Sequence, residues 1–253
     1  KKLRCCLHHR HPIRTNRVEK NFISLRHSNV QERYGYKNLK NENVKIDSGI
    51  KSYFTDKDQW GKKYLSPVIR TQEWELIVDE VEPKGSSNIF LTNFFQKDFC
   101  QEIIKMAEEN GNWTEKRHEF YPTTDMLIET IGMNEIYEDV LKNYLYPMAI
   151  DLWALEGKTW ESLSSESFII KYIPDQQSHL SFHHDYSLFT GLVTLNDDFE
   201  GGGTMFRRQK TCVKQSIGTM ALHPGNITHK HGARPITSGL RYVIVSFVNS
   251  DNP

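Results

Sequence analysis

The sequence predicts an α+β fold in which helices come first and a β-sandwich or jelly-roll barrel follows. In the middle of the chain, apolar residues recur at a spacing near 3.6, which is typical of amphipathic helices. After residue 166 the spacing changes to near 2, in short segments rich in β-branched and aromatic residues. Helical segments followed by many short strands and turns indicate this fold class.

Two segments have the pattern of helices. Residues 94–110 place apolar side chains near one face, and Gly111 follows where a C-terminal capping glycine is expected. A second helix is predicted over residues 135–155. Pro147 should kink or divide it, because proline cannot donate a backbone hydrogen bond.

Short strands are predicted after the helices, each bounded by a turn rich in Gly, Pro, Asn or Asp. The predicted strands are 167–173, 188–195, 204–208, 218–223 and 241–248. The turns between them are 174–175, 196–198, 201–203, 224–226 and 238–239.

The chain divides into three zones. Residues 1–45 form a basic N-terminal arm or connector, since eleven Lys and Arg face only two Glu up to residue 40. No nucleic-acid-binding motif accompanies this charge, so we interpret the arm as a solvated connector rather than a nucleic-acid contact. Residues 46–87 alternate apolar pieces with charge and are expected to pack as an accessory segment on a catalytic domain that covers residues 88–253.

Composition favours a soluble globular protein, with zero formal net charge and 38% hydrophobic residues. No apolar run approaches the roughly 18–20 residues that a membrane span needs. The N-terminus lacks the apolar stretch of a secretory signal. Four cysteines are too few for a disulfide-based scaffold of this length, so the compartment stays open.

A metal site is predicted at residues 181–185. In a strand, alternate side chains share a face, so His183 and Asp185 point together while His184 points away. Two such ligands with a histidine from a distant strand make a 2-His-1-carboxylate facial triad, which leaves positions open on a bound iron. A closed structural zinc site is excluded, because no cysteines lie nearby.

The third ligand should come from the histidine-rich stretch that follows the predicted strand 218–223. His223, His229 and His231 all qualify by residue type, and the residues alone leave the choice between His229 and His231 open. Arg241, at the start of an apolar strand, suits a carboxylate that binds beside the metal, because its planar fork matches that group. The alternative is an edge-strand arginine in a surface ion pair.

Several motifs together resemble the C-terminal catalytic domain of the procollagen lysyl hydroxylases, which are iron- and 2-oxoglutarate-dependent dioxygenases of the double-stranded β-helix fold. The motifs are Tyr172-x-Pro-Asp-x-Gln177, His183-His-Asp-x-Ser-x-Phe-Thr190, Glu200-Gly-Gly-Gly203, His223-Pro-Gly-x-x-Thr-His-x-His231-Gly and Gly239-x-Arg241-Tyr-x-x-Val-Ser-Phe-Val248. Weaker similarity extends upstream to about residue 50, and residues 1–45 scarcely match. The family often has a cysteine where this chain has Thr204.

The resemblance implies roles for particular residues. In the family the distal iron ligand lies ten residues before the 2-oxoglutarate arginine, which selects His231 and pairs it with Arg241. The iron ligands are then His183, Asp185 and His231, while Arg241 and Tyr172 bind the distal carboxylate of 2-oxoglutarate. The family also joins two cysteines that match Cys100 and Cys212, so a disulfide is expected between them.

The resemblance further implies Fe(2+), 2-oxoglutarate and L-ascorbate as cofactors and dioxygen as co-substrate. The expected reaction is hydroxylation of peptidyl lysine at C5 in collagen-like Gly-X-Y polypeptides, with release of succinate and CO2. A homodimer and the endoplasmic reticulum lumen are also implied, with Ile227 either in the dimer face or in the barrel core. Candidate partners for the lysine ammonium are Asp125, Asp198 and Glu200.

Alternative functions stay open at this point. The same chemistry could act on peptidyl proline or another substrate. A β-barrel binding module that has lost catalysis belongs to a different class, and the intact set of triad and arginine argues against it. A zinc hydrolase on the same triad gives no role to Arg241.

Overall fold

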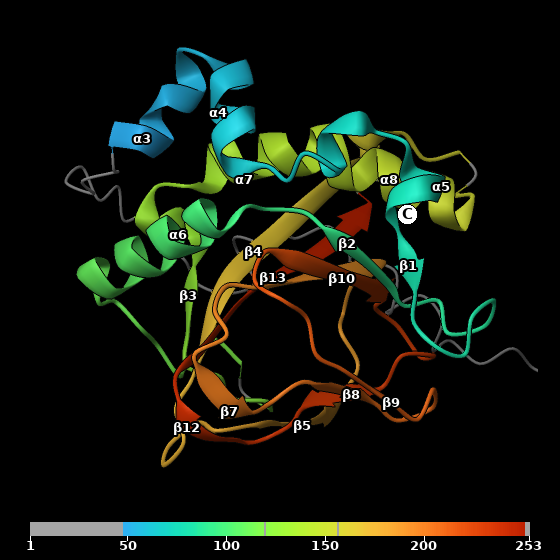
Figure 1. Ribbon diagram of the computed structural model, residues 1–253. Helices are drawn as coiled ribbons and strands as arrows, with labels where there is room; N and C mark the ends of the chain where they lie inside the picture. The colour runs from blue at the N-terminus through green and yellow to red at the C-terminus, as the bar shows by residue number, and fades with distance from the viewer. Residues whose placement is uncertain (1–47, 119, 156, 251–253) are drawn as a thin grey trace, which may run out of the picture. The chain divides into compact units, whose positions relative to one another are not determined.

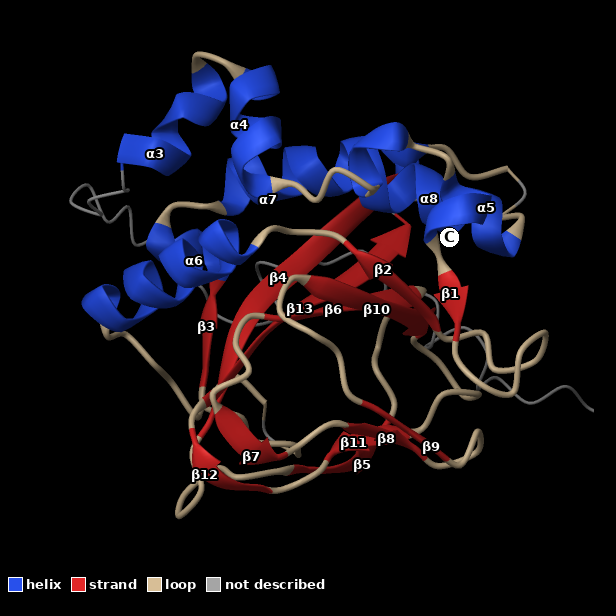
Figure 2. Ribbon diagram, viewed as in Figure 1, coloured by secondary structure: helices blue, strands red, loops and turns tan. Residues whose placement is uncertain are grey.

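The computed structural model describes residues 48–118, 120–155 and 157–250, and the predicted basic arm at residues 1–45 lies outside these ranges. Two antiparallel β-sheets face each other and enclose the interior of a barrel, and helices cover the outer face of the larger sheet (Figures 1 and 2). This arrangement confirms the predicted α+β class with a jelly-roll core.

The major sheet has seven strands within the described residues, and every neighbouring pair is antiparallel. In sheet order the strands are β1 (Asp79–Glu80), β2 (Phe90–Asn93), β10 (Thr219–Pro224), β6 (Phe189–Thr194), β13 (Arg241–Ser250), β4 (Leu163–Tyr172) and β3 (Asp125–Leu127). The four strands predicted at 167–173, 188–195, 218–223 and 241–248 are β4, β6, β10 and β13.

The minor sheet closes the other side of the barrel (Figure 2). Its strands in order are β5 (Leu180–His183), β11 (His231–Ala233), β8 (Thr204–Phe206) and β9 (Thr211–Val213). A separate pair, β7 (Phe199–Gly201) with β12 (Ile236–Gly239), continues this wall. The predicted strand 204–208 is β8, two residues shorter than expected.

Helices make up more than half of the described residues between positions 48 and 162. They are α3 (Ser48–Lys51), η1 (Ser52–Phe54), α4 (Lys57–Tyr64), η2 (Ile69–Thr71), α5 (Trp74–Ile77), α6 (Lys97–Asn110), η3 (Ile128–Ile131), α7 (Asn134–Val140), η4 (Leu141–Leu145), α8 (Tyr146–Trp153) and η5 (Trp160–Ser162). The helix predicted at 94–110 is α6. It ends at Gly111, whose positive φ of 69° lets its N–H donate to the carbonyl of Ala107.

The second predicted helix is interrupted at the expected place. Between α7 and α8 the backbone forms the π-helical turn η4, in which the N–H of Tyr146 bonds to the carbonyl of Leu141. Pro147 follows at the first positions of α8. A proline lacks the N–H that would bond four residues back, and a wider turn absorbs that loss without ending the helix.

Alternation along β13 separates two cores. Tyr242 and Ile244 face the helices and belong to the large core between the helices and the major sheet. Val243 and Val245 face the barrel interior with Phe168. Because the period of a strand is two, Arg241 is on the same face as Val243 and points into the barrel.

Residues 48–87 share the large core with the helices that follow. Trp60 on α4 is 1% exposed, and its ring lies 6.1 Å from that of Phe99 on α6. Tyr64, one turn later on α4, lies 6.3 Å from Phe99. The limits of the three zones stay a prediction.

Within the described ranges, no helix is both long and apolar enough to span a membrane.

The expected disulfide between Cys100 and Cys212 is wrong, since both cysteines are free. Cys100 is buried on α6, in the core outside the major sheet, whereas Cys212 is exposed on β9 of the minor sheet. The barrel separates the two elements (Figure 1).

The barrel-core alternative for Ile227 is also wrong, because this residue is 85% exposed.

Candidate metal centre and carboxylate site

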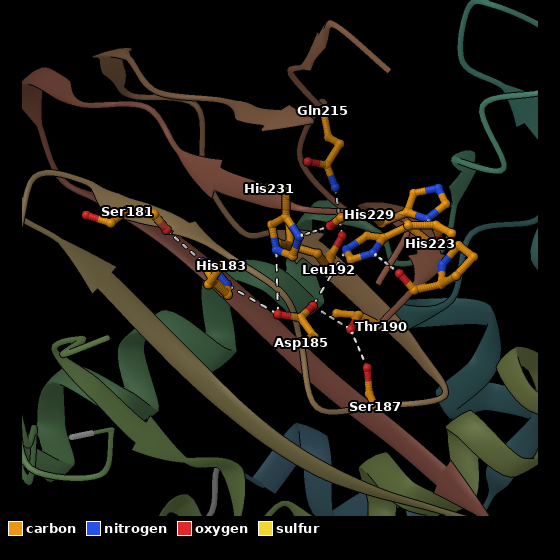
Figure 3. Close-up of polar contacts among 12 residues, drawn as sticks. Ser181, His183, Asp185, Ser187, Thr190, Leu192, Gln215, His223, His229 and His231 are labelled. Atoms are coloured by element: carbon orange, nitrogen blue, oxygen red, sulfur yellow. Dashed lines mark hydrogen bonds and ion pairs between the residues drawn. The ribbon is translucent and has the colours of Figure 1, made fainter. Parts of the chain in front are cut away.

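Three predicted ligands meet inside the barrel where β5 and β11 pair. His183, the last residue of β5, lies directly opposite His231, the first residue of β11. Asp185 follows two residues after His183, and its Oδ1 lies 3.2 Å from His183 Nε2 and 3.6 Å from His231 Nε2 (Figure 3). His184 is exposed, as alternation predicted. One ligand atom from each of the three residues lies within 4.8 Å of the others.

Both histidines are held in the tautomer that a metal requires. The Nδ1 atom of His183 lies 2.8 Å from the carbonyl oxygen of Ser181, and that of His231 lies 2.9 Å from the carbonyl oxygen of His229. A carbonyl only accepts hydrogen bonds, so we assign the proton of each ring to Nδ1. This leaves Nε2 of each ring as the atom that a metal would bind, and both Nε2 atoms are directed toward Asp185, which is the arrangement of metal-binding histidines.

Electrostatics favour an ionised carboxylate in this site. Burial raises the pKa of Asp185, but His231 and His183 outweigh it and hold the pKa well below its ordinary value. Burial lowers the pKa of His231 below its ordinary value. For His183 burial also acts downward, yet the adjacent Asp185 carboxylate raises the pKa above its ordinary value. The group thus has one buried negative charge and one neutral imidazole, which suits a divalent cation.

The other two candidate histidines do not join this group. His229 lies between Thr228 and the carbonyl oxygen of Ser87, which its Nε2 contacts at 2.8 Å. His223 is 1% exposed, and its Nε2 lies 3.8 Å from the other carboxylate oxygen of Asp185. Burial lowers the pKa of His223 to about 3. The geometry therefore supports His231 as the third ligand.

Arg241 has the surroundings of an anion-binding residue. It is 2% exposed at the start of β13 and pairs with Tyr172, the last residue of β4. Its guanidinium carbon lies 5.2 Å from the Tyr172 ring and 5.9 Å from the Phe199 ring. In the part of the chain that the structure describes, no carboxylate lies within ion-pair distance of it. A buried charge without a partner is costly, so this site fits an anionic ligand.

Tyr172 connects the two halves of the site. Burial raises the pKa of its phenol, the Arg241 guanidinium opposes this shift, and the Asp185 carboxylate adds to it. The phenol therefore lies within electrostatic reach of both the arginine and the metal-site carboxylate.

The predicted partners of a substrate ammonium differ in their availability. Asp125 is fully buried and already bonds to Arg117 at 2.8 Å and to Thr123. Asp198 accepts a hydrogen bond from Asn196. Glu200 is exposed on β7.

Two side chains beside the site escaped the sequence analysis. Thr190 donates a hydrogen bond to Asp185, and the ring of Tyr121 lies 5.3 Å from that of His183. The one signal for Thr190 was its position at the end of the motif that begins at His183.

Known proteins resemble this chain in sequence and in fold. No family model matches it. The human multifunctional procollagen lysine hydroxylase and glycosyltransferase LH3 is 33% identical over 211 residues, which are 78% of this chain and 28% of that protein. The mouse procollagen-lysine,2-oxoglutarate 5-dioxygenase 2 is 29% identical over 209 residues, with the same coverage. The chain thus spans just over a quarter of the length of these relatives.

Among solved structures, a Pseudomonas putida prolyl-4-hydroxylase superposes with a TM-score of 0.52 and 13% identity, covering 66% of this chain and 95% of that one. At such low identity the likeness concerns the fold alone. The chain is therefore similar in sequence to the procollagen-lysine 2-oxoglutarate 5-dioxygenases, as its motifs indicated, and its jelly-roll fold is similar to that of the bacterial prolyl-4-hydroxylase.

Proposed function

We propose that this chain carries an iron- and 2-oxoglutarate-dependent dioxygenase domain that hydroxylates C5 of peptidyl lysine in collagen-like sequences. One observation carries the proposal: the same barrel interior holds a His-Asp-His group whose two Nε2 atoms converge on Asp185 and a buried arginine that no described carboxylate neutralises. A metal hydrolase would need only the first of these features. A non-catalytic barrel would need neither.

His183, Asp185 and His231 would hold ferrous iron, and Arg241 with Tyr172 would hold the distal carboxylate of 2-oxoglutarate. Bound together, iron and 2-oxoglutarate supply the oxidation of a C–H bond by dioxygen, with release of succinate and carbon dioxide. L-ascorbate belongs to the proposal as the reductant that keeps the metal ferrous.

The protein contributes orientation and exclusion of water. His183, Asp185 and His231 would hold the metal and leave it accessible to the oxo acid and dioxygen. The planar Arg241 fork can grip a carboxylate through two parallel hydrogen bonds, which fixes the direction of the acid as well as its affinity. Because Arg241, Tyr172 and Asp185 are each at most 3% exposed, these contacts act in a largely dry interior.

Lysine is the proposed target because the names of both relatives described above give procollagen lysine as the residue that they modify. Glu200 is exposed on β7, so its carboxylate is available to a substrate ammonium. Peptidyl proline is the second candidate, since the superposed bacterial structure is that of a prolyl-4-hydroxylase. We also propose a homodimer whose interface includes Ile227, an exposed apolar side chain in the segment between β10 and β11. The proposed location is the endoplasmic reticulum lumen.

The test is succinate release with ferrous iron, 2-oxoglutarate and ascorbate across collagen-like peptides that contain lysine, proline or neither. Mass spectrometry locates the added oxygen. We expect turnover with lysine peptides, and no turnover by the Asp185→Ala variant, whose circular dichroism should match the wild type. If only proline is modified, the proposed substrate residue becomes proline instead of lysine. Full activity of Asp185→Ala would refute the metal triad. Absence of both iron binding and turnover would favour the non-catalytic binding module.

A further inference from the structure

A buried chain of hydroxyl groups ends on the oxygen of Asp185 that faces away from the two triad histidines. Asp185 Oδ1 lies near His183 and His231, while Oδ2 accepts a hydrogen bond of 2.6 Å from Thr190 Oγ1. Ser187 Oγ lies 2.9 Å from the same Thr190 oxygen (Figure 3). Asp185, Thr190 and Ser187 are 3%, 1% and 3% exposed, so bulk water does not compete for these bonds.

The direction of these hydrogen bonds follows from the Asp185 carboxylate at one end of the chain. An ionised carboxylate can only accept, so the Thr190 hydroxyl hydrogen points at Asp185 Oδ2. The Thr190 oxygen then accepts from Ser187, and the order is Ser187 to Thr190 to Asp185. Each hydrogen bond polarises the next in a low-dielectric interior, which strengthens the hydrogen bond from Thr190 to Asp185 Oδ2.

The backbone of Gly225 packs closely against Ser187. A Cβ atom built on Gly225 would lie 2.0 Å from Ser187 Oγ and 2.4 Å from the Ser187 carbonyl oxygen. Thr190 is also the cross-strand partner of His223, so the pairing of β6 with β10 sets its position. The glycine of the turn after β10 therefore has a steric reason: a side chain there would displace Ser187 from Thr190.

We propose that Thr190 is a positioning residue that holds Asp185 as a ligand through Oδ1 alone, with Ser187 and Gly225 supporting it. The inference rests on the proposed function, since the orientation of Asp185 matters in this way only if the triad binds a metal. Without the Thr190 hydroxyl, Oδ2 is buried without a donor and the carboxylate is free to rotate. Hydrogen bonds that orient a metal ligand typically change metal affinity about 10- to 100-fold.

The experiment uses Co(II) as the probe, added to the metal-free full chain. Calorimetry gives the affinity, and visible absorption reports the ligand geometry. Thr190→Val removes the hydroxyl at constant shape, and Thr190→Ser keeps it. Thr92→Val is the matched control, because Thr92 is also a buried strand threonine and its hydroxyl has no hydrogen-bond partner among the described residues.

We expect Thr190→Val to weaken Co(II) binding at least tenfold and to change its absorption spectrum, with a smaller loss for Ser187→Ala. Thr190→Ser and Thr92→Val should stay within about twofold of the wild type. Wild-type affinity and spectrum in Thr190→Val would overturn the positioning role alone, as would a folded Thr190→Ser that fails equally. If the wild type binds no Co(II), the proposed metal site fails as well.

Discussion

His183 and His231 are direct cross-strand partners, although 48 positions separate them in the sequence. Their ring centroids lie 4.5 Å apart, and each ring bonds through Nδ1 to the carbonyl two residues earlier in its own segment. The site is therefore a product of strand register. A slip of one residue would turn one of the two imidazoles to the outer face of the minor sheet.

Replacing His229 and His231 one at a time tests which of them is the third metal ligand. His231→Ala should lose metal binding at least 100-fold, because one of three ligands is gone. His229→Ala should bind within a few-fold of the wild type, since its Nε2 contacts the Ser87 carbonyl rather than Asp185. Mn(II) titration followed by electron paramagnetic resonance measures both. The opposite ranking would move the third ligand to His229.

Replacement of Arg241 tests the anion site. Arg241→Gln should raise the Kd for 2-oxoglutarate about 10- to 150-fold, since a charge-assisted hydrogen bond contributes about 1.5–3 kcal/mol. Tyr172→Phe, which loses one neutral hydrogen bond, should cost about 2- to 10-fold. Calorimetry on the Mn(II)-loaded protein measures both values, with the exposed Arg207→Gln as the control. Unchanged affinity in Arg241→Gln would place the oxo acid elsewhere.

Metal affinity should fall on acidification. The pKa of His183 lies above its ordinary value of 6.5, because the effect of Asp185 exceeds that of burial. Its proton therefore stabilises the metal-free fold fully below pH 6.5, and this contribution disappears as the pH rises through the raised value. A metal must displace that proton, so affinity should weaken up to about tenfold per pH unit below this pKa. Mn(II) titrations at pH 6, 7 and 8 would contradict this if the Kd stayed constant.

The two described cysteines should differ sharply in reactivity. Burial raises the pKa of the Cys100 thiol to about 12, whereas Cys212 is exposed. At pH 8 only about one Cys100 in ten thousand is thiolate, so iodoacetamide should label Cys212 and spare Cys100 until the protein unfolds. Peptide mapping without reductant gives the test. A cross-linked peptide pair would restore the Cys100–Cys212 disulfide that the family resemblance implied.

Removal of the Trp60 ring tests whether residues 48–87 are part of the folded unit. Its centroid lies 4.9 Å from the Tyr53 ring and 5.0 Å from the Tyr64 ring. Trp60→Ala should lower the free energy of unfolding by about 3–5 kcal/mol, as expected for a large side chain removed from a core. Trp160→Ala, at a 46% exposed site, should cost under about 0.5 kcal/mol. Urea unfolding measures both, and equal small losses would detach this segment from the core.

Much of the site follows from the sequence alone, because strand alternation is a local property. The two-residue period put His183 and Asp185 on one face and His184 on the other, and both placements agree with the structure. The same period along β13 directs Arg241 into the barrel with Val243 and Val245. The fold class, α6 and the interruption before Pro147 were also predictable, since helical periodicity, a capping glycine and a missing N–H act within a few residues.

Other features depended on contacts between distant segments. The residues themselves left His229 and His231 open, and the pairing of β11 with β5 is what brings His231 to Asp185. Strands β7, β9 and β11 have three residues each, too few to show a period. Spacing also carries no information about which cysteines meet, so the barrel between Cys100 and Cys212 could only be seen in three dimensions. The local pattern thus determined which way side chains face, and the register of strands far apart in the chain decided which of them meet.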